Sequence, residues 1–363
     1  MNATVARIVE IMFQDTIMND EVTAIKDEVM NNCQERYEDL VARGMDEDVA
    51  IGAVIDSLKG MEEVIAQYPK KAKTVPYQEA GDDDEKDLTF APEQFDAVKL
   101  LLTSEDVNVE RSDDEMVHVR YDSAKLPDLE VAVLDGVLDI RRDMAGKKYG
   151  NIHGKKLFGN MNIQLNFNFL STSGNVSICL PEQKTFQVEV VNTSGDVSVE
   201  EVMLSNLSVA TTSGDVNVNL DESVCLQCLE VSATSGDIDV CANAQSVALN
   251  TVSGDIEYHG DSPEMEISTV SGDGDIEART QRVNLGSVSG DMELEVLDGT
   301  LENVNANTTS GDVTINLPKS LQNRVTVQMN TLSGDCRYHY DRNPTDPLAL
   351  VCMNSTSGDL RVN

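Results

Sequence analysis

A short polar motif, Ser-Gly-Asp, is repeated along most of this chain and is its most conspicuous candidate for chemistry. With one Ser-Gly-Asn copy included, it recurs every 18 to 24 residues, with serines at Ser173, Ser194, Ser213, Ser235, Ser253, Ser271, Ser289, Ser310, Ser333 and Ser357. A column of aspartates could bind Ca²⁺, as aspartates do in other repeat proteins. Calcium requires about six to eight oxygen ligands, however, and these repeats lack the additional glycines and aspartates of calcium-binding nonapeptides.

The same motif can be explained as a corner of the backbone. Glycine permits a positive φ and a close approach of neighbouring chains, and serine and aspartate side chains can bond nearby backbone N–H groups. Asn175, which replaces the aspartate of the first copy, would weaken a metal site but not such a turn. We therefore interpret the motif as structural, with representative corner residues Ser213, Gly214, Asp215, Gly236, Asp237, Gly254, Asp255, Gly290 and Asp291.

One copy departs from this pattern. In "SGDGDIEA", residues 271–278, we predict an insertion of two residues, with Asp273 and Asp275 flanking Gly274. A local bulge is the simpler interpretation, and a weak Ca²⁺ or other cation site at the two aspartates is the alternative. No other cofactor is predicted.

The concentrated positive charge of the chain lies in residues 141–160, "RRDMAGKKYGNIHGKKLFGN". Its glycines do not follow the phosphate-loop pattern, so we expect a long loop or hairpin rather than a nucleotide site. Such a segment could dock on the chain's own acidic surface or on an acidic partner, or it could be a flexible insertion. The interaction candidates are Arg141, Arg142, Lys147, Lys148, Lys155 and Lys156.

Residue types that are typical of catalysis are scattered. Four histidines are present, none at metal-ligand or catalytic-triad spacing: His118, His153, His259 and His339. Cys225 and Cys228 form a lone Cys-x-x-Cys without a second pair, so we expect ordinary thiols there. We predict that the chain is not an enzyme.

The residues around each corner alternate between apolar and polar, which is typical of strands with one buried face. Around Ser213, Leu207 and Val209 precede the corner, and Val216 and Val218 follow it. A fixed period of about 20 residues indicates that such strand–corner–strand units stack on one another. The sequence therefore predicts a β-solenoid with two short strands per rung and a rung spacing of about 4.8 Å.

The alternating pattern of strand, corner and strand extends back to residue 88 in a less regular form, in "VKLLLTSEDVNV" and "LEVAVLDGVLDI". We predict about twelve rungs of 18–24 residues over residues 88–363, irregular in 88–165 and regular in 166–363. The irregular rungs are expected at the end of the stack, because terminal repeats cap a solenoid core.

Residues 1–69 have a helical period instead. Val22, Val29, Cys33 and Tyr37 fall on one face of a predicted helix that begins near Asn19 or Asp20. Residues 70–87 are charged and lack an apolar period, which is typical of a linker. The predicted fold class is therefore mainly β, a β-solenoid preceded by a small α-helical domain and an acidic linker.

Two stretches resemble known families. The repeated Thr-x-Ser-Gly-Asp-Val-x-Val, with "ICLPEQKTFQVEVVNTSGDVSV" and "INLPKSLQNRVTVQMNTLSGD", resembles the bacterial putative-adhesin family of Ser-Gly-Asp repeat β-solenoids over about 270 residues. That resemblance implies the solenoid fold and provides no catalytic residues. "YEDLVARGMDEDVAIGAVIDSLKGMEEVIAQY" resembles the helical HAAS-type signalling domain, which implies a protein-interaction module. A helical bundle that only caps its neighbour is the alternative.

The composition limits the classes of partner that we expect. With 64 Asp+Glu against 27 Lys+Arg the formal net charge is -37, which disfavours nucleic acid and anionic lipid and attracts cations or basic partners. No stretch approaches the roughly 20 apolar residues of a membrane span. The absence of a secretory leader and the odd number of cysteines, seven, predict a reducing, cytoplasmic location.

Three functions follow as hypotheses. The first is a non-enzymatic scaffold or regulatory protein that binds a protein partner, or self-associates, through the helical domain or an uncapped C-terminal rung at residues 353–363. The second is a cell-surface adhesin or carbohydrate-binding solenoid. The third is a polysaccharide-active β-helix enzyme, which would need an acid–base cluster on one face.

Overall fold

The computed structural model of the protein describes residues 9, 13, 20–43, 45, 50, 51, 53, 54, 57, 58, 78–80, 84–142 and 174–363. The chain divides into two compact units, residues 1–74 and 75–363, and each is described by itself. In the described parts of the chain, no helix is long and apolar enough to cross a membrane.

The first unit contains helix α2 (Asp20–Ala42), which begins where the sequence predicts it. The predicted apolar face is buried, at Val22, Val29, Cys33 and Tyr37. These side chains share one hydrophobic cluster with Val9, Phe13, Ala50, Val54 and Leu58. The helical period of the sequence therefore identified the buried face correctly.

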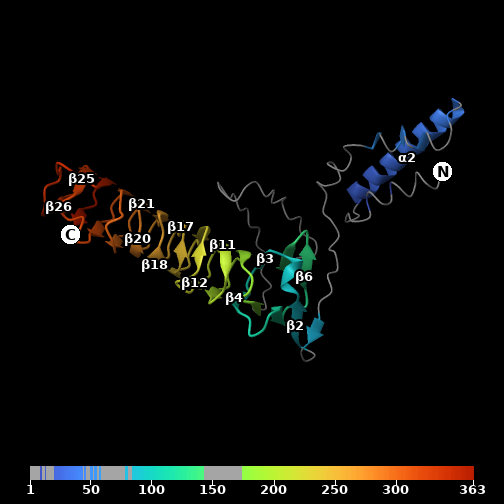
Figure 1. The fold of residues 1–363 in the computed structure, drawn as a ribbon, viewed down its shortest axis with the longest axis horizontal. Helices are drawn as coiled ribbons and strands as arrows, with labels where there is room; N and C mark the ends of the chain where they lie inside the picture. The colour runs from blue at the N-terminus through green and yellow to red at the C-terminus, as the bar shows by residue number, and fades with distance from the viewer. Residues whose placement is uncertain are drawn as a thin grey trace. The chain divides into compact units, whose positions relative to one another are not determined.

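The second unit is a β-solenoid, as predicted, in which the strands stack side by side (Figure 1). Its first sheet has 14 strands in the spatial order β1 (Gln78–Ala80), β2 (Glu85–Phe90), β5 (Val117–Asp122), β8 (Asn175–Leu180), β4 (Asp106–Arg111), β10 (Val197–Glu200), β12 (Val216–Asn219), β15 (Ile238–Cys241), β18 (Ile256–Asp261), β20 (Gly274–Arg279), β22 (Met292–Val296), β24 (Val313–Asn316), β28 (Leu360–Val362) and β26 (Cys336–Tyr338).

The second sheet faces the first and has 12 strands. Their order is β25 (Val325–Asn330), β27 (Ala349–Asn354), β23 (Asn303–Thr308), β21 (Arg282–Ser287), β19 (Glu264–Ser268), β17 (Ser246–Asn250), β14 (Cys228–Ser232), β11 (Leu204–Ala210), β9 (Phe186–Val191), β3 (Ala97–Leu101), β7 (Val137–Arg142) and β6 (Leu129–Leu134). A third, two-stranded sheet joins β13 (Cys225–Leu226) to β16 (Asn243–Ala244). A 3₁₀ turn, η1 (Pro92–Gln94), precedes β3.

The core is a stack of aliphatic rows between the two large sheets. Strands β12, β15, β18 and β20 pair in parallel without a shift of register, so that Val218, Val240, Tyr258 and Ile276 lie one above the other. All four are almost completely buried. The period of two in the sequence therefore determines which side chains enter the core.

The regular part of the solenoid has about 8 turns, fewer than the twelve rungs predicted. The difference arises at the N-terminal end, where β1, β2, β5 and β8 pair antiparallel with one another. Strands β6 and β7, which the sequence suggested as a rung, form an antiparallel hairpin. Its turn residues Asp135 and Gly136 have φ of 48° and 80°, the left-handed conformations of a two-residue type I′ turn.

The rungs do not stack in chain order at this end. Strand β4 lies between β8 and β10, and β3 lies between β7 and β9. The rung of residues 97–111 therefore joins directly to the rung of residues 186–200. The irregular strands lie at one end of the stack, as expected, but they do not follow chain order there, because β8 lies between β5 and β4.

At the C-terminal end, too, the rungs do not stack in chain order. The final strand, β28, lies between β24 and β26, and β27 lies between β23 and β25. The last rung in the sequence is therefore internal in the stack. The prediction of an exposed C-terminal rung at residues 353–363 is wrong.

The rung that does end the stack, formed by β25 and β26, is covered by the segment that follows β26. The Val327 amide donates to the Arg342 carbonyl at 3.0 Å, and the Arg342 guanidinium donates to the Cys336 carbonyl at 2.7 Å. The Tyr340 hydroxyl bonds the Gln322 side chain at 3.0 Å. These bonds occupy backbone groups that an edge strand would otherwise offer to another chain.

Candidate functional site

The corner glycines stack in a column in which there is no room for a side chain. A Cβ on Gly236 would lie 1.9 Å from the carbonyl oxygen of Gly214, and a Cβ on Gly254 would lie 2.0 Å from that of Gly236. Positive φ is not the reason for glycine here, because among the described glycines it occurs only at Gly136 and Gly260. The close approach of neighbouring rungs alone requires glycine.

The hydroxyl groups of the corner bond to backbone. Ser271 donates both its amide and its hydroxyl to the Val252 carbonyl of the preceding rung, at 3.0 and 3.2 Å. The Thr251 hydroxyl accepts from the Gly254 amide and donates to the Gly236 carbonyl, both at 3.2 Å. The polar residues of the motif therefore satisfy the backbone of the turn, as the structural interpretation requires.

The aspartates form a ladder between rungs. The Oδ1 atom of each aspartate accepts the backbone N–H of the aspartate in the adjacent rung, for example Asp255 N–H to Asp237 Oδ1 at 2.8 Å. This aspartate ladder runs in spatial order through Asp106, Asp196, Asp215, Asp237, Asp255, Asp273, Asp291, Asp312, Asp359 and Asp335. The sequence predicted a bond to nearby backbone N–H groups, and the structure directs that bond to the next rung.

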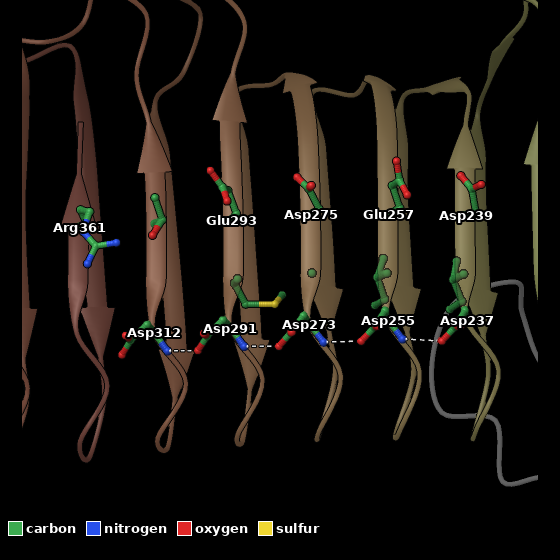
Figure 2. A pocket seen from close by; sticks show the side chains of 15 residues that line it. Asp237, Asp239, Asp255, Glu257, Asp273, Asp275, Asp291, Glu293, Asp312 and Arg361 are labelled. Atoms are coloured by element: carbon green, nitrogen blue, oxygen red, sulfur yellow. Dashed lines mark hydrogen bonds between the residues drawn. The ribbon is translucent and has the colours of Figure 1, made fainter.

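A second row of carboxylates runs parallel to the ladder on the same outer face (Figure 2). It consists of Asp239, Glu257, Asp275 and Glu293, which are in register on β15, β18, β20 and β22. Thr314 and then Arg361 continue the row on β24 and β28. In the sequence, these residues are recognisable only as the polar members of an alternating pattern.

The two rows line a shallow groove of about 610 Å³, which we call the carboxylate groove. Nine carboxylates and one arginine line it: Asp237, Asp239, Asp255, Glu257, Asp273, Asp275, Asp291, Glu293, Asp312 and Arg361. Rungs about 4.8 Å apart place like charges side by side, which concentrates negative potential along the groove. The groove is therefore suited to an elongated positively charged ligand.

Asp273 and Asp275 do not flank an insertion. Gly274 is in register with Ile256 and Met292, at an inward position of the alternating pattern. A Cβ on Gly274 would lie 2.7 Å from Met292 Sδ, so the methionine side chain fills the space that glycine leaves. The predicted two-residue insertion is wrong, and glycine instead replaces a core residue.

The two aspartates therefore belong to different rows. Asp273 is part of the ladder, where its Oδ1 accepts the Asp291 N–H at 2.8 Å. Asp275 belongs to the second row, next to Glu257 and Glu293. In the described part of the chain, no group of three His, Cys, Asp or Glu side chains is arranged to hold a metal ion.

His259 lies beside the groove between two glutamates. Its Nε2 is 3.0 Å from Glu257 Oε1, and its Nδ1 is 3.3 Å from Glu277 Oε2. The hydrogen bond to Glu257, with the negative charges of Glu277 and Asp275, raises the pKa of His259 above its usual value despite partial burial. Protonated His259 offsets part of the negative charge of this face.

The six basic residues that the sequence suggested for interaction do not form one described surface. Arg141 lies at the end of β7 and pairs with Asp139. Arg142 is buried and pairs with Glu105 and, at 3.0 Å, with Asp128, so it is part of the fold rather than of an exposed docking loop. Lys147, Lys148, Lys155 and Lys156 lie outside the described residues.

A histidine and a cysteine face each other at the N-terminal end. His118 on β5 is opposite Cys179 on β8, and its ring nitrogens are 2.9 Å from Asp87 and 3.1 Å from Asp114. Cys179 is 2% exposed, and burial raises the pKa of its thiol to about 11. Such a thiol is protonated at neutral pH and does not act as a nucleophile.

All seven cysteines are free thiols. Cys225 on β13 is exposed, whereas Cys228 at the start of β14 is buried. The Cys-x-x-Cys pair is therefore divided between a surface and a core position.

Comparison with known proteins extends this description. No curated protein shows significant similarity to the sequence. Solved structures with a similar fold include a putative lipid binding protein from Parabacteroides distasonis, with 16% identity and a TM-score of 0.47 over 77% of this chain and 98% of that one. A putative adhesin from the same organism has 14% identity and a TM-score of 0.44 over 77% and 98% of the two chains.

A putative adhesin from Bacteroides fragilis has 11% identity and a TM-score of 0.38 over 78% of this chain and 98% of that one. At these identities the likeness concerns the fold alone. The family model named Toastrack DUF4097 matches residues 95–357, which are most of the solenoid. The chain therefore belongs to the Toastrack DUF4097 family.

Proposed function

We propose that this chain is a non-enzymatic scaffold protein whose solenoid binds a positively charged segment of a protein partner in the carboxylate groove. The observation that supports this proposal is the second row of carboxylates, Asp239, Glu257, Asp275 and Glu293, beside the aspartate ladder. The ladder has a structural task, because each aspartate bonds the next rung. The second row has no comparable bond to the backbone. Three of its carboxylates bond one side chain each, from Asn217, His259 and Asn316, and their remaining acceptor positions can meet a ligand.

The shape of the groove favours a chain-like ligand over a single ion. Its carboxylates follow a line across five consecutive rungs rather than converging on a point. A metal ion needs several oxygens at one centre, whereas lysine and arginine side chains of a peptide can meet carboxylates one after another. The parallel, fully paired strands hold the row in place before the ligand arrives, which lowers the entropy cost of binding.

Hydrolysis of a polysaccharide receives less support. Glycosidases surround their two carboxylates with groups that bind a sugar ring. Among the described residues that line the carboxylate groove, the side chains other than carboxylates are aliphatic, Thr314, Met292 or Arg361, and none is aromatic.

The helical unit complements the solenoid in this proposal. Its amphipathic helix α2 and the resemblance of residues 37–68 to HAAS-type domains support a second interaction module. A reducing compartment is proposed because all seven cysteines are free, with Cys225 and Cys241 exposed. That location is less compatible with the alternative of a cell-surface adhesin.

A titration with octalysine tests the proposed function. We expect wild-type protein to bind the labelled peptide with an affinity that falls steeply with salt, because exposed charges are screened. The variant Asp239→Asn/Asp275→Asn/Glu293→Gln should lose about tenfold or more in affinity. These substitutions keep side-chain acceptors for Asn217 and Asn316, which bond Asp239 and Glu293.

A matched control removes the same number of charges elsewhere. Glu222→Gln/Glu230→Gln/Glu266→Gln changes residues outside the groove lining. It should bind octalysine within about twofold of wild type, since distant charges are screened beyond about 10 Å. Equal losses of affinity in both triple variants would show that net charge alone determines binding, and would refute the groove as the binding site.

A further inference from the structure

Three exposed valines stand in a column at the corners of the rungs that carry the carboxylate groove. Val252, Val270 and Val288 precede the corner serines and are 43%, 42% and 46% exposed. Single exposed apolar residues are ordinary, but a contiguous column is typical of a contact surface. We call this column the valine ridge.

The ridge coincides with the groove along the solenoid. Each valine precedes a ladder aspartate by three residues, namely Asp255, Asp273 and Asp291. Three residues of chain span at most about 11 Å, so the ridge lies beside the groove. The same position in adjacent rungs on both sides is a threonine: Thr212, Thr234 and Thr309. Threonine therefore fits this corner, and folding does not require an apolar side chain there.

The backbone of the ridge is already paired. The carbonyl groups of Val252, Val270 and Val288 accept the amides of Ser271, Ser289 and Ser310 in the next rungs at 2.9 to 3.0 Å. An extended partner strand would find these acceptors occupied, so addition of a strand is disfavoured at this face. A partner must bind through side chains.

The spacing of the valines favours a helical partner. Three rungs place the outer valines about 9.6 Å apart, since neighbouring strands are about 4.8 Å apart. Residues i and i+7 on one face of an α-helix are about 10.5 Å apart, whereas residues i and i+4 of an extended strand are about 13.4 Å apart. A helix along the solenoid axis matches the ridge within about 1 Å, and a strand does not.

We infer that the partner segment is a basic amphipathic α-helix that lies along the solenoid axis, with its apolar stripe on the valine ridge and its lysines or arginines over the carboxylate groove. This inference rests on the proposed function and specifies its ligand. The apolar contact supplies affinity that salt does not screen, and the carboxylates select positive charge. A helix with side chains is about 10 to 12 Å wide, so a helix seated on the ridge reaches the ladder side of the groove, and its long lysine or arginine side chains can extend over the groove.

Three peptides test the inference on the full chain. The first is a leucine–lysine helix of about 18 residues with leucines at i, i+3, i+4 and i+7 and lysines on the adjoining face. The second has the same composition with the leucines distributed around the helix, and the third is octalysine. We expect the first peptide to bind more tightly than the second and to gain helicity by circular dichroism on binding.

The valine ridge is then changed to the residue of the neighbouring rungs, in Val252→Thr/Val270→Thr/Val288→Thr. We expect this variant to bind the amphipathic helix about tenfold more weakly and octalysine within about twofold of wild type. The reciprocal variant Thr212→Val/Thr234→Val/Thr309→Val lengthens the ridge and should bind a longer amphipathic helix more tightly than wild type does.

The outcomes separate the two proposals. If octalysine binds in the groove but the valine variant binds the amphipathic helix as well as wild type does, the helical ligand is refuted and the groove function stands. If the rearranged peptide binds as tightly as the amphipathic one, the inference fails in the same way. If neither octalysine nor the amphipathic helix responds to the Asp239, Asp275 and Glu293 substitutions, the proposed function itself is refuted.

Discussion

At the corners of the rungs that follow Gly195, the backbone of one glycine lies directly against the carbonyl oxygen of the glycine in an adjacent rung. The requirement for glycine is therefore imposed by the backbone of the neighbouring rung, not by the residue's own φ. Both reasons are compatible with the sequence, which separates them no further because it contains neither φ nor the distance between rungs. Glycine recurs at the positions where neighbouring rungs are in backbone contact.

A single added methyl group at such a corner should have a large effect on stability. Gly236→Ala would place Cβ 1.9 Å from the Gly214 carbonyl oxygen, and the rungs on both sides would have to separate. We expect a loss of about 3 kcal/mol or more in the free energy of unfolding, measured by urea denaturation.

Gly299→Ala is the control for this prediction, because its Cβ would meet the Ser320 hydroxyl at 3.1 Å, and that hydroxyl can move. It should cost less than about 1 kcal/mol. A tolerated Gly236→Ala would mean that the rungs are not as close as described.

His259 provides a residue-scale test of the charge on the groove face. Its pKa is raised by Glu257, Glu277 and Asp275, so its protonated form is favoured in the folded state. Its contribution to stability is fully present below the unfolded pKa of about 6.5 and is lost as pH rises through the higher folded-state pKa.

NMR titration of the His259 ring measures this value directly. We expect a pKa above about 6.5 in wild type and a lower one in Glu257→Gln, which removes the charge nearest to Nε2. An unchanged His259 pKa in Glu257→Gln would contradict the assigned cause.

The strands themselves could be predicted because their pattern is local. Alternation around each corner depends on residues a few positions apart, and Val216, Val218, Ile238 and Val240 are buried as that pattern requires. The order in which the rungs stack could not be predicted. Repeats with the same inward residues are equivalent partners for one another, so local pattern does not show that the rung of residues 97–111 lies beside the rung of residues 186–200.

Two other signals were present in the sequence. Asp135-Gly136 between alternating apolar residues is a strong hairpin signal, and the hairpin of β6 and β7 forms there. The carboxylate groove could also have been found by aligning the residue four positions after each corner serine, which gives Asp239, Glu257, Asp275 and Glu293 in succession. The position of this row beside the valine ridge is known only from the structure.

The N-terminal rung contains a buried ion pair that leads to an element-scale prediction. Glu105 replaces the corner glycine, is fully buried, and pairs with the buried Arg142 of β7. It also accepts the amides of Thr103 and Ser104 at 2.8 and 3.0 Å. The pair joins the rung of residues 97–111 to the hairpin that follows it in sequence.

Neutralising Glu105 removes the fully buried partner of Arg142, which keeps only its bond to the more exposed Asp128 among the described ion pairs. Glu105→Gln should therefore lower the free energy of unfolding by about 3 to 5 kcal/mol. Arg279→Gln removes an exposed pair with Asp261 and should cost less than about 1 kcal/mol in the same urea experiment. Similar small losses in both variants would show that the Glu105–Arg142 pair is not essential to the N-terminal rung.

At the scale of the whole molecule, the negative charge is organised as well as abundant. The formal net charge of -37 would by itself attract any cation weakly and without a defined position. The solenoid arranges nine carboxylates along one groove by repeating them at equivalent positions in successive rungs. The proposed function depends on this arrangement rather than on the total charge.

The most direct test is therefore to locate a bound polycation on the surface. Octalysine is bound at low salt and fixed with a carbodiimide, which joins lysine amines to carboxylates in contact, and the linked residues are identified by mass spectrometry. We expect the links to concentrate on Asp239, Glu257, Asp275 and Glu293. Links distributed in proportion over all exposed acidic residues, or concentrated on the opposite sheet at Glu230 and Glu266, would contradict this expectation.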